Sequence, residues 1–177
     1  MYAPKIYLAG KISKNCWRKQ LVPDLRDMRW ADGPLDCVSF NYVGPFFVGC
    51  DHGCYHGSNT HGNLPLMGTC NEINGTAEFL RRLHQENLRK TCMKAIDDCD
   101  ILFAYIDEHK CYGTISEIEY AVNINKIVIV NFAPSIASES KNDFWFATVD
   151  ANSVNFQVSR DKLKKMFNEV LELQWIF

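Results

Sequence analysis

The carboxylate of Glu117 stands at a place in the sequence where α/β proteins commonly bind ligands. Residues 99–106 are almost wholly apolar, which is typical of a parallel strand covered on both faces. The polar residues 107–110 end that run, and Gly113-Thr114 then opens a predicted helix with Glu117 in its first turn. Ligands of open α/β sheets bind beyond the carboxyl ends of the strands, so this order delivers Glu117 to the expected crevice.

The predicted position of Glu117 also predicts its charge. Free backbone N–H groups and the positive end of the helix dipole favour an ionised carboxylate, so we expect Glu117 to be ionised near neutral pH. An ionised carboxylate in a crevice suits nucleophilic attack better than proton donation. Acidic residues are also common in first helical turns for dipole reasons alone, so this position is equally compatible with a structural role.

Two segments of the chain resemble the nucleoside 2-deoxyribosyltransferase and nucleotide N-glycosidase superfamily. The sequence KIYLAG at residues 5–10 is similar to the first strand and glycine turn of that family. Within residues 84–132, a strand, a Gly-Thr-x-x-Glu segment, x-x-x-Ala and another buried strand follow one another in the family's order. The resemblance implies that Glu117 is the nucleophile at the sugar C1′, and that Tyr7 and Gly10 line the substrate pocket.

The chain departs from the family pattern at several positions. Lys11 and Ser13 differ from the residues that follow the glycine turn in the nucleotide-hydrolase branch. Two aspartates that position and protonate the substrate in the transferase branch are replaced by Cys92 and Cys111. Asp107 and Asp51 are the candidates to take over their role.

Other residues are predicted to bind substrate. A glycine turn before a helix is a natural anion site, so Lys11, Ser13 and the turn amides could hold a phosphate or a sugar hydroxyl. An aromatic ring could stack on the base; the candidates are Tyr7, Trp17 and Tyr112. The remaining predicted substrate-binding residues flank the nucleophile or lie in the loop described next: Asp107, Gly113, Thr114, Asp51 and His52.

Residues 43–75 form a Gly-, His- and Cys-rich insertion. They hold seven of the 10 glycines, three of the five histidines and three of the eight cysteines. Interleaved aromatic residues argue against simple disorder, so we predict an ordered loop over the crevice, with Asp51 and His52 available to a base or ribose. A purely structural loop is the alternative. The spacing of Cys50, His52, Cys54, His56 and His61 fits known zinc patterns poorly, so we predict no metal.

Length and composition indicate one domain spanning residues 1–177. A net charge of −2 gives no reason to expect nucleic-acid polymers as partners. We see no membrane span or signal-peptide pattern, and most cysteines outside the insertion sit in strand-like or helix-like runs, as buried thiols do. These features predict a reduced, cytoplasmic protein that does not act at a membrane.

The elements needed to position Glu117 define the fold class. We predict a flavodoxin-like or Rossmann-like domain with about five mostly parallel strands and helices on both faces. The predicted strands are residues 4–10, 36–42, 99–106, 126–132 and a short segment at 144–149. The predicted helices run from Ser13 to about Met28, where Pro23 is awkward, over residues 76–97, from Gly113 onward, and from Arg160 to Leu173 after a Ser159 cap.

The sequence thus predicts an enzyme that cleaves the N-glycosidic bond of a nucleoside or nucleotide, by hydrolysis or transfer, without a cofactor. One alternative is a TIR-type NAD-cleaving domain, which shares the broad architecture and a catalytic Glu. The other is a nucleotide-sensing module that keeps the crevice without catalysis. The apolar tail at residues 175–177, together with the family's habit of sharing pockets between subunits, predicts a homo-oligomer, most simply a dimer.

Overall fold

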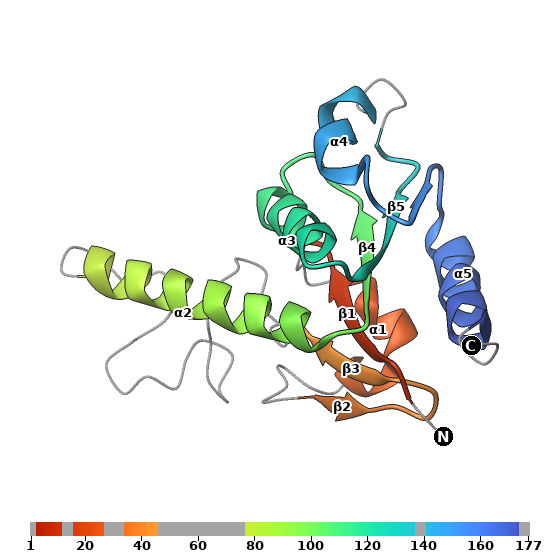
Figure 1. Ribbon diagram of the computed structural model, residues 1–177, viewed down its shortest axis with the longest axis horizontal. Coiled ribbons are helices and arrows are strands. Elements are labelled where there is room, and N and C mark those ends of the chain that lie inside the picture. Colours follow the sequence, from red (N-terminus) through yellow and green to blue (C-terminus); the bar gives the residue numbers. More distant parts are fainter. Residues whose placement is uncertain (1–2, 12–15, 27–33, 46–76, 137–140, 174–177) are drawn as a thin grey trace.

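A six-stranded, mostly parallel sheet organises the part of the chain that the computed structural model describes, which is residues 3–11, 16–26, 34–45, 77–136 and 141–173. The strand order is β2-β3-β1-β4-β5-β6, and β2 pairs antiparallel with β3 (Figure 1). The strands are β1 (Lys5–Ala9), β2 (Leu35–Asp36), β3 (Asn41–Gly44), β4 (Ile101–Ile106), β5 (Ile127–Phe132) and β6 (Ser153–Asn155). The predicted α/β fold class is confirmed, with six strands rather than five.

Helices cover both faces of this sheet, as predicted. They are α1 (Arg18–Leu21), α2 (Ala77–Asp98), α3 (Tyr112–Asn123), α4 (Lys141–Thr148) and α5 (Arg160–Leu173), with a 3₁₀ turn at Pro23–Arg26. Figure 1 shows α2 and α3 on one side of the sheet and α5 on the other. Within the described ranges, no helix is both long and apolar enough to cross a membrane.

Alternating side chains of the central strands divide the core into two layers. Leu8 of β1 and Phe103 of β4 pack with Trp17 and with Phe167 of α5. Tyr7, the neighbour of Leu8, faces the opposite layer with residues of α2 and α3. All six residues of β4 are buried, which explains why its sequence is a continuous apolar run. The Glu117 helix therefore packs on the same face of the sheet as Tyr7.

Two predicted strands are wrong. Residues 36–42 belong to two strands, because a tight turn in which the Cys37 N–H donates to the Phe40 carbonyl (2.9 Å) reverses the chain between β2 and β3. Residues 144–149 lie mainly in α4, where Phe144, Ala147 and Thr148 are buried at helical spacing. The short strand β6 follows α4 and was not predicted.

The helix predicted from Ser13 to Met28 is much shorter. α1 ends at Leu21, and Pro23 begins the 3₁₀ turn, since proline lacks the N–H that would continue the helix. The predicted inner face is nevertheless confirmed, because Trp17, Leu21 and Leu25 are all buried. Ser13 lies outside the described residues.

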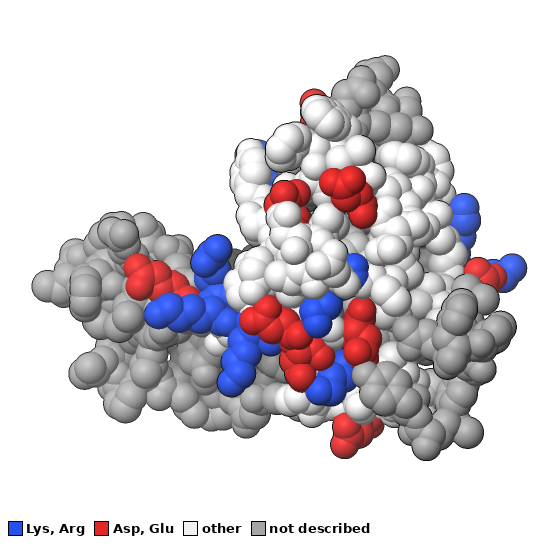
Figure 2. Space-filling view, in the orientation of Figure 1, with Lys and Arg blue, Asp and Glu red and all other residues white. Residues whose placement is uncertain are grey.

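The other predicted elements are confirmed closely. α2 and α5 match their predicted ranges within one residue, and Ser159 caps α5 by accepting a hydrogen bond from the Lys162 N–H at 3.3 Å. The amino edge of the sheet carries paired charges, including Lys5 with Asp98 at 2.7 Å. Figure 2 shows acidic and basic side chains mixed on this face of the molecule. Several of the basic side chains gather over α2, with acidic side chains beside them (Figure 2).

Gly10 ends β1 with a backbone that no larger residue can adopt without displacing its neighbours. Its φ is +158°, and an added Cβ would lie 2.7 Å from the Tyr105 carbonyl oxygen and 2.9 Å from Trp17 Nε1. We expect Gly10→Ala to lower the free energy of unfolding by about 2 kcal/mol, because a close-packed core cannot absorb the clash.

Gly113 is the matched control, because nothing lies within 4 Å of a Cβ added there and it sits in helix α3. We expect Gly113→Ala to raise the free energy of unfolding by up to about 1 kcal/mol through helix propensity. Urea unfolding of both variants measures the contrast. Similar free energies of unfolding for Gly10→Ala and Gly113→Ala would show that the turn after β1 is not sterically constrained.

Candidate active site

Glu117 lies in the second turn of α3. The helix starts at Tyr112, with Cys111 in the N-cap position, and no acidic residue stands in its first turn. The prediction that Glu117 occupies the first turn is therefore wrong by about one turn, because the helix begins before Gly113. Glu117 therefore lies further from the free N–H groups at the helix start than predicted, and it faces the sheet.

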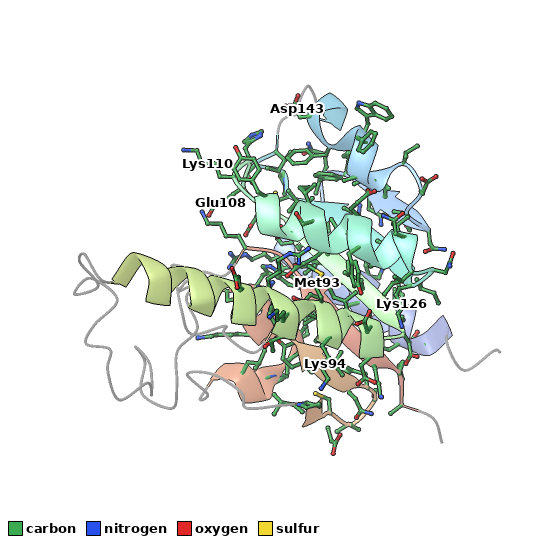
Figure 3. The ribbon with its side chains drawn as sticks, turned by 60° about the vertical axis from the view of Figure 1, so that its left-hand side comes forward. Met93, Lys94, Glu108, Lys110, Lys126 and Asp143 are labelled. Carbon is green, nitrogen blue, oxygen red and sulfur yellow. The ribbon has the colours of Figure 1, made fainter. Side chains whose placement is uncertain are left out.

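The carboxylate of Glu117 meets side chains from two other elements. The Tyr7 hydroxyl of β1 donates a hydrogen bond of 2.6 Å to Glu117 Oε1. Cys92 of α2 also hydrogen-bonds to the carboxylate. Figure 3 labels Met93, the residue after Cys92, between α2 and α3. Residues that are far apart in the sequence are thus gathered where α2 and α3 pack against β1.

Burial changes the charge of Glu117. Loss of hydration raises its pKa to about 7, although hydrogen bonds from Tyr7 and Cys92 and the positive charge of Arg18 all act to lower it. The expectation that Glu117 is ionised throughout the neutral range is therefore corrected, since both forms are populated near pH 7. Desolvation outweighs the helix dipole because Glu117 packs against the sheet.

The two donors stay neutral over the same range. Burial raises the pKa of Cys92 to about 12 and that of Tyr7 well above its ordinary value. The thiol and the phenol consequently keep their protons at neutral pH and can donate to the carboxylate. A carboxylate that titrates near pH 7 between neutral donors suits nucleophilic or acid–base chemistry.

Asp107 occupies the carboxyl end of β4 and is a second candidate carboxylate. Its Oδ2 lies 3.9 Å from the Arg160 guanidinium, and its backbone carbonyl accepts a hydrogen bond from Ser135. Burial raises the pKa of Asp107, and the nearby Arg160 charge acts in the opposite direction. Asp107 thus combines partial burial with a fixed cation, which suits a proton donor or acceptor.

The other predicted substrate-binding residues differ in accessibility. Lys11 forms an ion pair with Glu108 at the surface. Tyr112 is 78% exposed, Gly113 is exposed, and Thr114 is buried. Figure 3 shows Glu108 and Lys110 in the segment that leads into α3.

Of the three aromatic rings predicted to stack on a base, only Tyr112 is accessible. Tyr7 and Trp17 are 0% and 1% exposed, so their rings belong to the core and the stacking prediction for them is wrong. Tyr7 instead contributes its hydroxyl to Glu117. The sequence signals for that role were a hydroxyl on a largely apolar strand and the resemblance that placed Tyr7 in the pocket.

The insertion predictions fall outside the described residues. This holds for Asp51, His52 and the five Cys and His side chains considered as zinc ligands. Among the residues that the structure describes, no three His, Cys, Asp or Glu side chains are grouped as a metal site would need. Ser13 is likewise outside the described ranges.

Sequence reasoning missed one residue altogether, which is Arg18. It is 0% exposed, its guanidinium donates to the Leu8 and Gly10 carbonyls, and its charge acts on Glu117. Its position directly after Trp17, which lies within the predicted apolar face of that helix segment, was the available signal.

No family model matches the sequence, and no curated protein is similar to it.

Proposed function

We propose that this protein cleaves the N-glycosidic bond of a nucleoside or nucleotide, with Glu117 as the nucleophile. The observation that supports this function best is the 2.6 Å hydrogen bond from Tyr7 to Glu117 Oε1. It fixes one oxygen of the carboxylate in position. The family resemblance around Gly10 and Gly113 adds independent support for the same residue.

The proposed reaction has two steps at the sugar C1′. In the first, a Glu117 oxygen forms a bond to C1′ while the C1′–N bond breaks, and the electron pair leaves with the base, which takes up a proton. In the second, water or another base attacks C1′ and the Glu117 carboxylate leaves. Water gives hydrolysis, and a second base gives transfer. Neither step requires a metal or an organic cofactor.

Proton transfer to the departing base needs a second group. Asp107 is our first candidate, because its partial burial raises its pKa and so favours the protonated form. Asp51 of the insertion is the alternative. Tyr112 is the aromatic side chain that could reach a base from the rim, because it is largely exposed.

We further propose a cytoplasmic homodimer that acts on small nucleosides or nucleotides rather than on nucleic-acid polymers. The net charge of −2 is consistent with small substrates. The apolar residues Trp175, Ile176 and Phe177 would then pack between subunits. Light scattering of the full chain and of a chain ending at Leu173 distinguishes a dimer from a monomer.

The function is tested by incubating the pure protein with deoxynucleosides, nucleoside monophosphates and NAD, and separating free bases by chromatography. Base release from the first two substrate classes, absent in Glu117→Gln, supports the proposal. Nicotinamide release from NAD alone favours a TIR-type activity. Tight binding of a nucleotide without any base release favours a sensing module and contradicts the enzymatic proposal.

A further inference from the structure

Arg18 is a buried cation that none of the steps above uses. Its Nε donates to the Leu8 carbonyl at 2.7 Å, and its Nη2 donates to the Gly10 carbonyl at 2.6 Å. Nη1 donates to the Lys11 carbonyl at 3.3 Å and contacts Cys16 Sγ at 3.2 Å. One guanidinium therefore binds the backbone carbonyls of Leu8, at the end of β1, and of Gly10 and Lys11, in the turn that follows.

This arrangement is unusual because the charge has no direct counter-ion among the described residues. The guanidinium lies 4.8 Å from the Trp17 ring, and its polar contacts are backbone carbonyls and the Cys16 sulfur. Burying a cation in this way costs several kcal/mol unless the surroundings compensate it. Three carbonyl dipoles compensate part of that cost, and a nearby anion would compensate more.

The nearest titratable group is Cys16, whose Sγ lies 3.2 Å from the guanidinium, and four more groups on other elements interact with Arg18. Its charge acts on Glu117 of α3, on Cys92 of α2 and on Tyr42 of β3, and it lowers the pKa of each. It also lowers the pKa of Asp107 after β4. Of these, only the two carboxylates carry a negative charge near neutral pH, because burial raises the pKa of Cys92 and of Tyr42.

We propose that Arg18 is the positioning residue of the site: its guanidinium fixes the turn after β1 and supplies the positive charge that stabilises the ionised Glu117 carboxylate. The catalytic meaning of this inference rests on the proposed function, whereas the electrostatic coupling does not. The same cation orders the Gly10–Lys11 segment, which is predicted to bind substrate. Loss of the charge should therefore change the ionisation of Glu117, whereas loss of the ordered turn should change substrate binding.

The test compares Arg18→Gln, which removes the charge, with Arg18→Lys, which keeps it but cannot bond three carbonyls. Lys164→Gln is the control, since it removes one positive charge from an exposed position on α5. The ionisation of Glu117 is followed by NMR of carboxyl carbons in protein labelled at glutamate. We expect the Glu117 midpoint to rise by roughly 0.5 to 1 pH unit in Arg18→Gln only.

Arg18→Lys should keep the Glu117 midpoint close to that of the wild type while raising KM by about tenfold or more, because the turn is no longer held. An unchanged midpoint in a folded Arg18→Gln overturns the inference. A protein without base release but with the expected NMR shift contradicts the proposed function and leaves the coupling standing.

A wild-type measurement covers the case in which Arg18→Gln does not fold. The Arg18 Nε–H resonance should change with pH at the same midpoint as the Glu117 carboxyl carbon, because the two charges interact. If the chemical shift of the Arg18 Nε–H does not change while Glu117 titrates, the inference is contradicted.

Discussion

Glu117→Gln should reduce base release by about 10³-fold or more while the protein stays folded. The amide keeps the shape of the side chain and can still accept the 2.6 Å hydrogen bond from Tyr7. It cannot attack C1′ as a carboxylate does, so the covalent step is lost while the architecture is retained. The initial rate of free-base formation at saturating substrate measures the effect.

Glu119→Gln is the internal control for this experiment. Glu119 lies two residues further along α3, which turns it about 200° around the helix axis from Glu117. Its carboxylate accepts a hydrogen bond from Asn123 at 3.1 Å, on the exposed side of the helix. We expect its activity to stay within about threefold of the wild type. If Glu117→Gln keeps activity within about tenfold, a difference of about 1.4 kcal/mol, the nucleophile is another residue.

The same substitution should stabilise the protein at alkaline pH. The pKa of Glu117 is about 7 in the folded chain against an ordinary value of 4.5. Between these two pH values the native state keeps a proton that the unfolded state has already lost, so the stability of the wild type falls as the pH rises through this window. Above pH 7 the wild type has lost this contribution to its stability completely. The Gln variant does not lose it, because its side chain stays neutral.

We expect Glu117→Gln to raise the free energy of unfolding by about 1 to 3 kcal/mol at pH 8, with allowance for the partial exposure of Glu117. At pH 4 the difference should be small, because the wild-type side chain is then protonated in both states. Urea unfolding of both proteins at the two pH values measures it. A difference that is the same at pH 4 and pH 8 would mean that Glu117 has no raised pKa.

Much of the fold could be predicted from the sequence, because the hydrophobic patterns of the central elements are each compatible with only one type of secondary structure. The apolar run of β4, the amphipathic pattern of α5 and the Ser159 cap each specified an element locally. Pro23 was recognised as awkward within the first helix, but that helix was still predicted to run to about Met28. Short elements were missed where one pattern fitted two structures, as in the segment of α4 that was predicted as a strand.

The candidate site was only partly predictable. Glu117 was predicted as the nucleophile from the resemblance, and the structure brings Tyr7 to it across 110 residues of sequence. The pKa of Glu117 depends on burial, on hydrogen bonds from Tyr7 and Cys92 and on the charge of Arg18, which come from other segments of the chain. Because desolvation is set by tertiary packing, no local pattern could have predicted that Glu117 titrates near neutral pH.

The central claim is that Glu117 forms a covalent bond to the sugar. A nucleoside with an electronegative fluorine at C2′ slows the breakdown of such an ester, because it destabilises the oxocarbenium-like transition state. After incubation with this compound and trypsin digestion, the peptide of residues 111–126 contains both Glu117 and Glu119, and fragmentation distinguishes them. We predict a sugar adduct on Glu117 that is absent from Glu117→Gln; base release without an adduct, or an adduct on any other residue, would contradict the account.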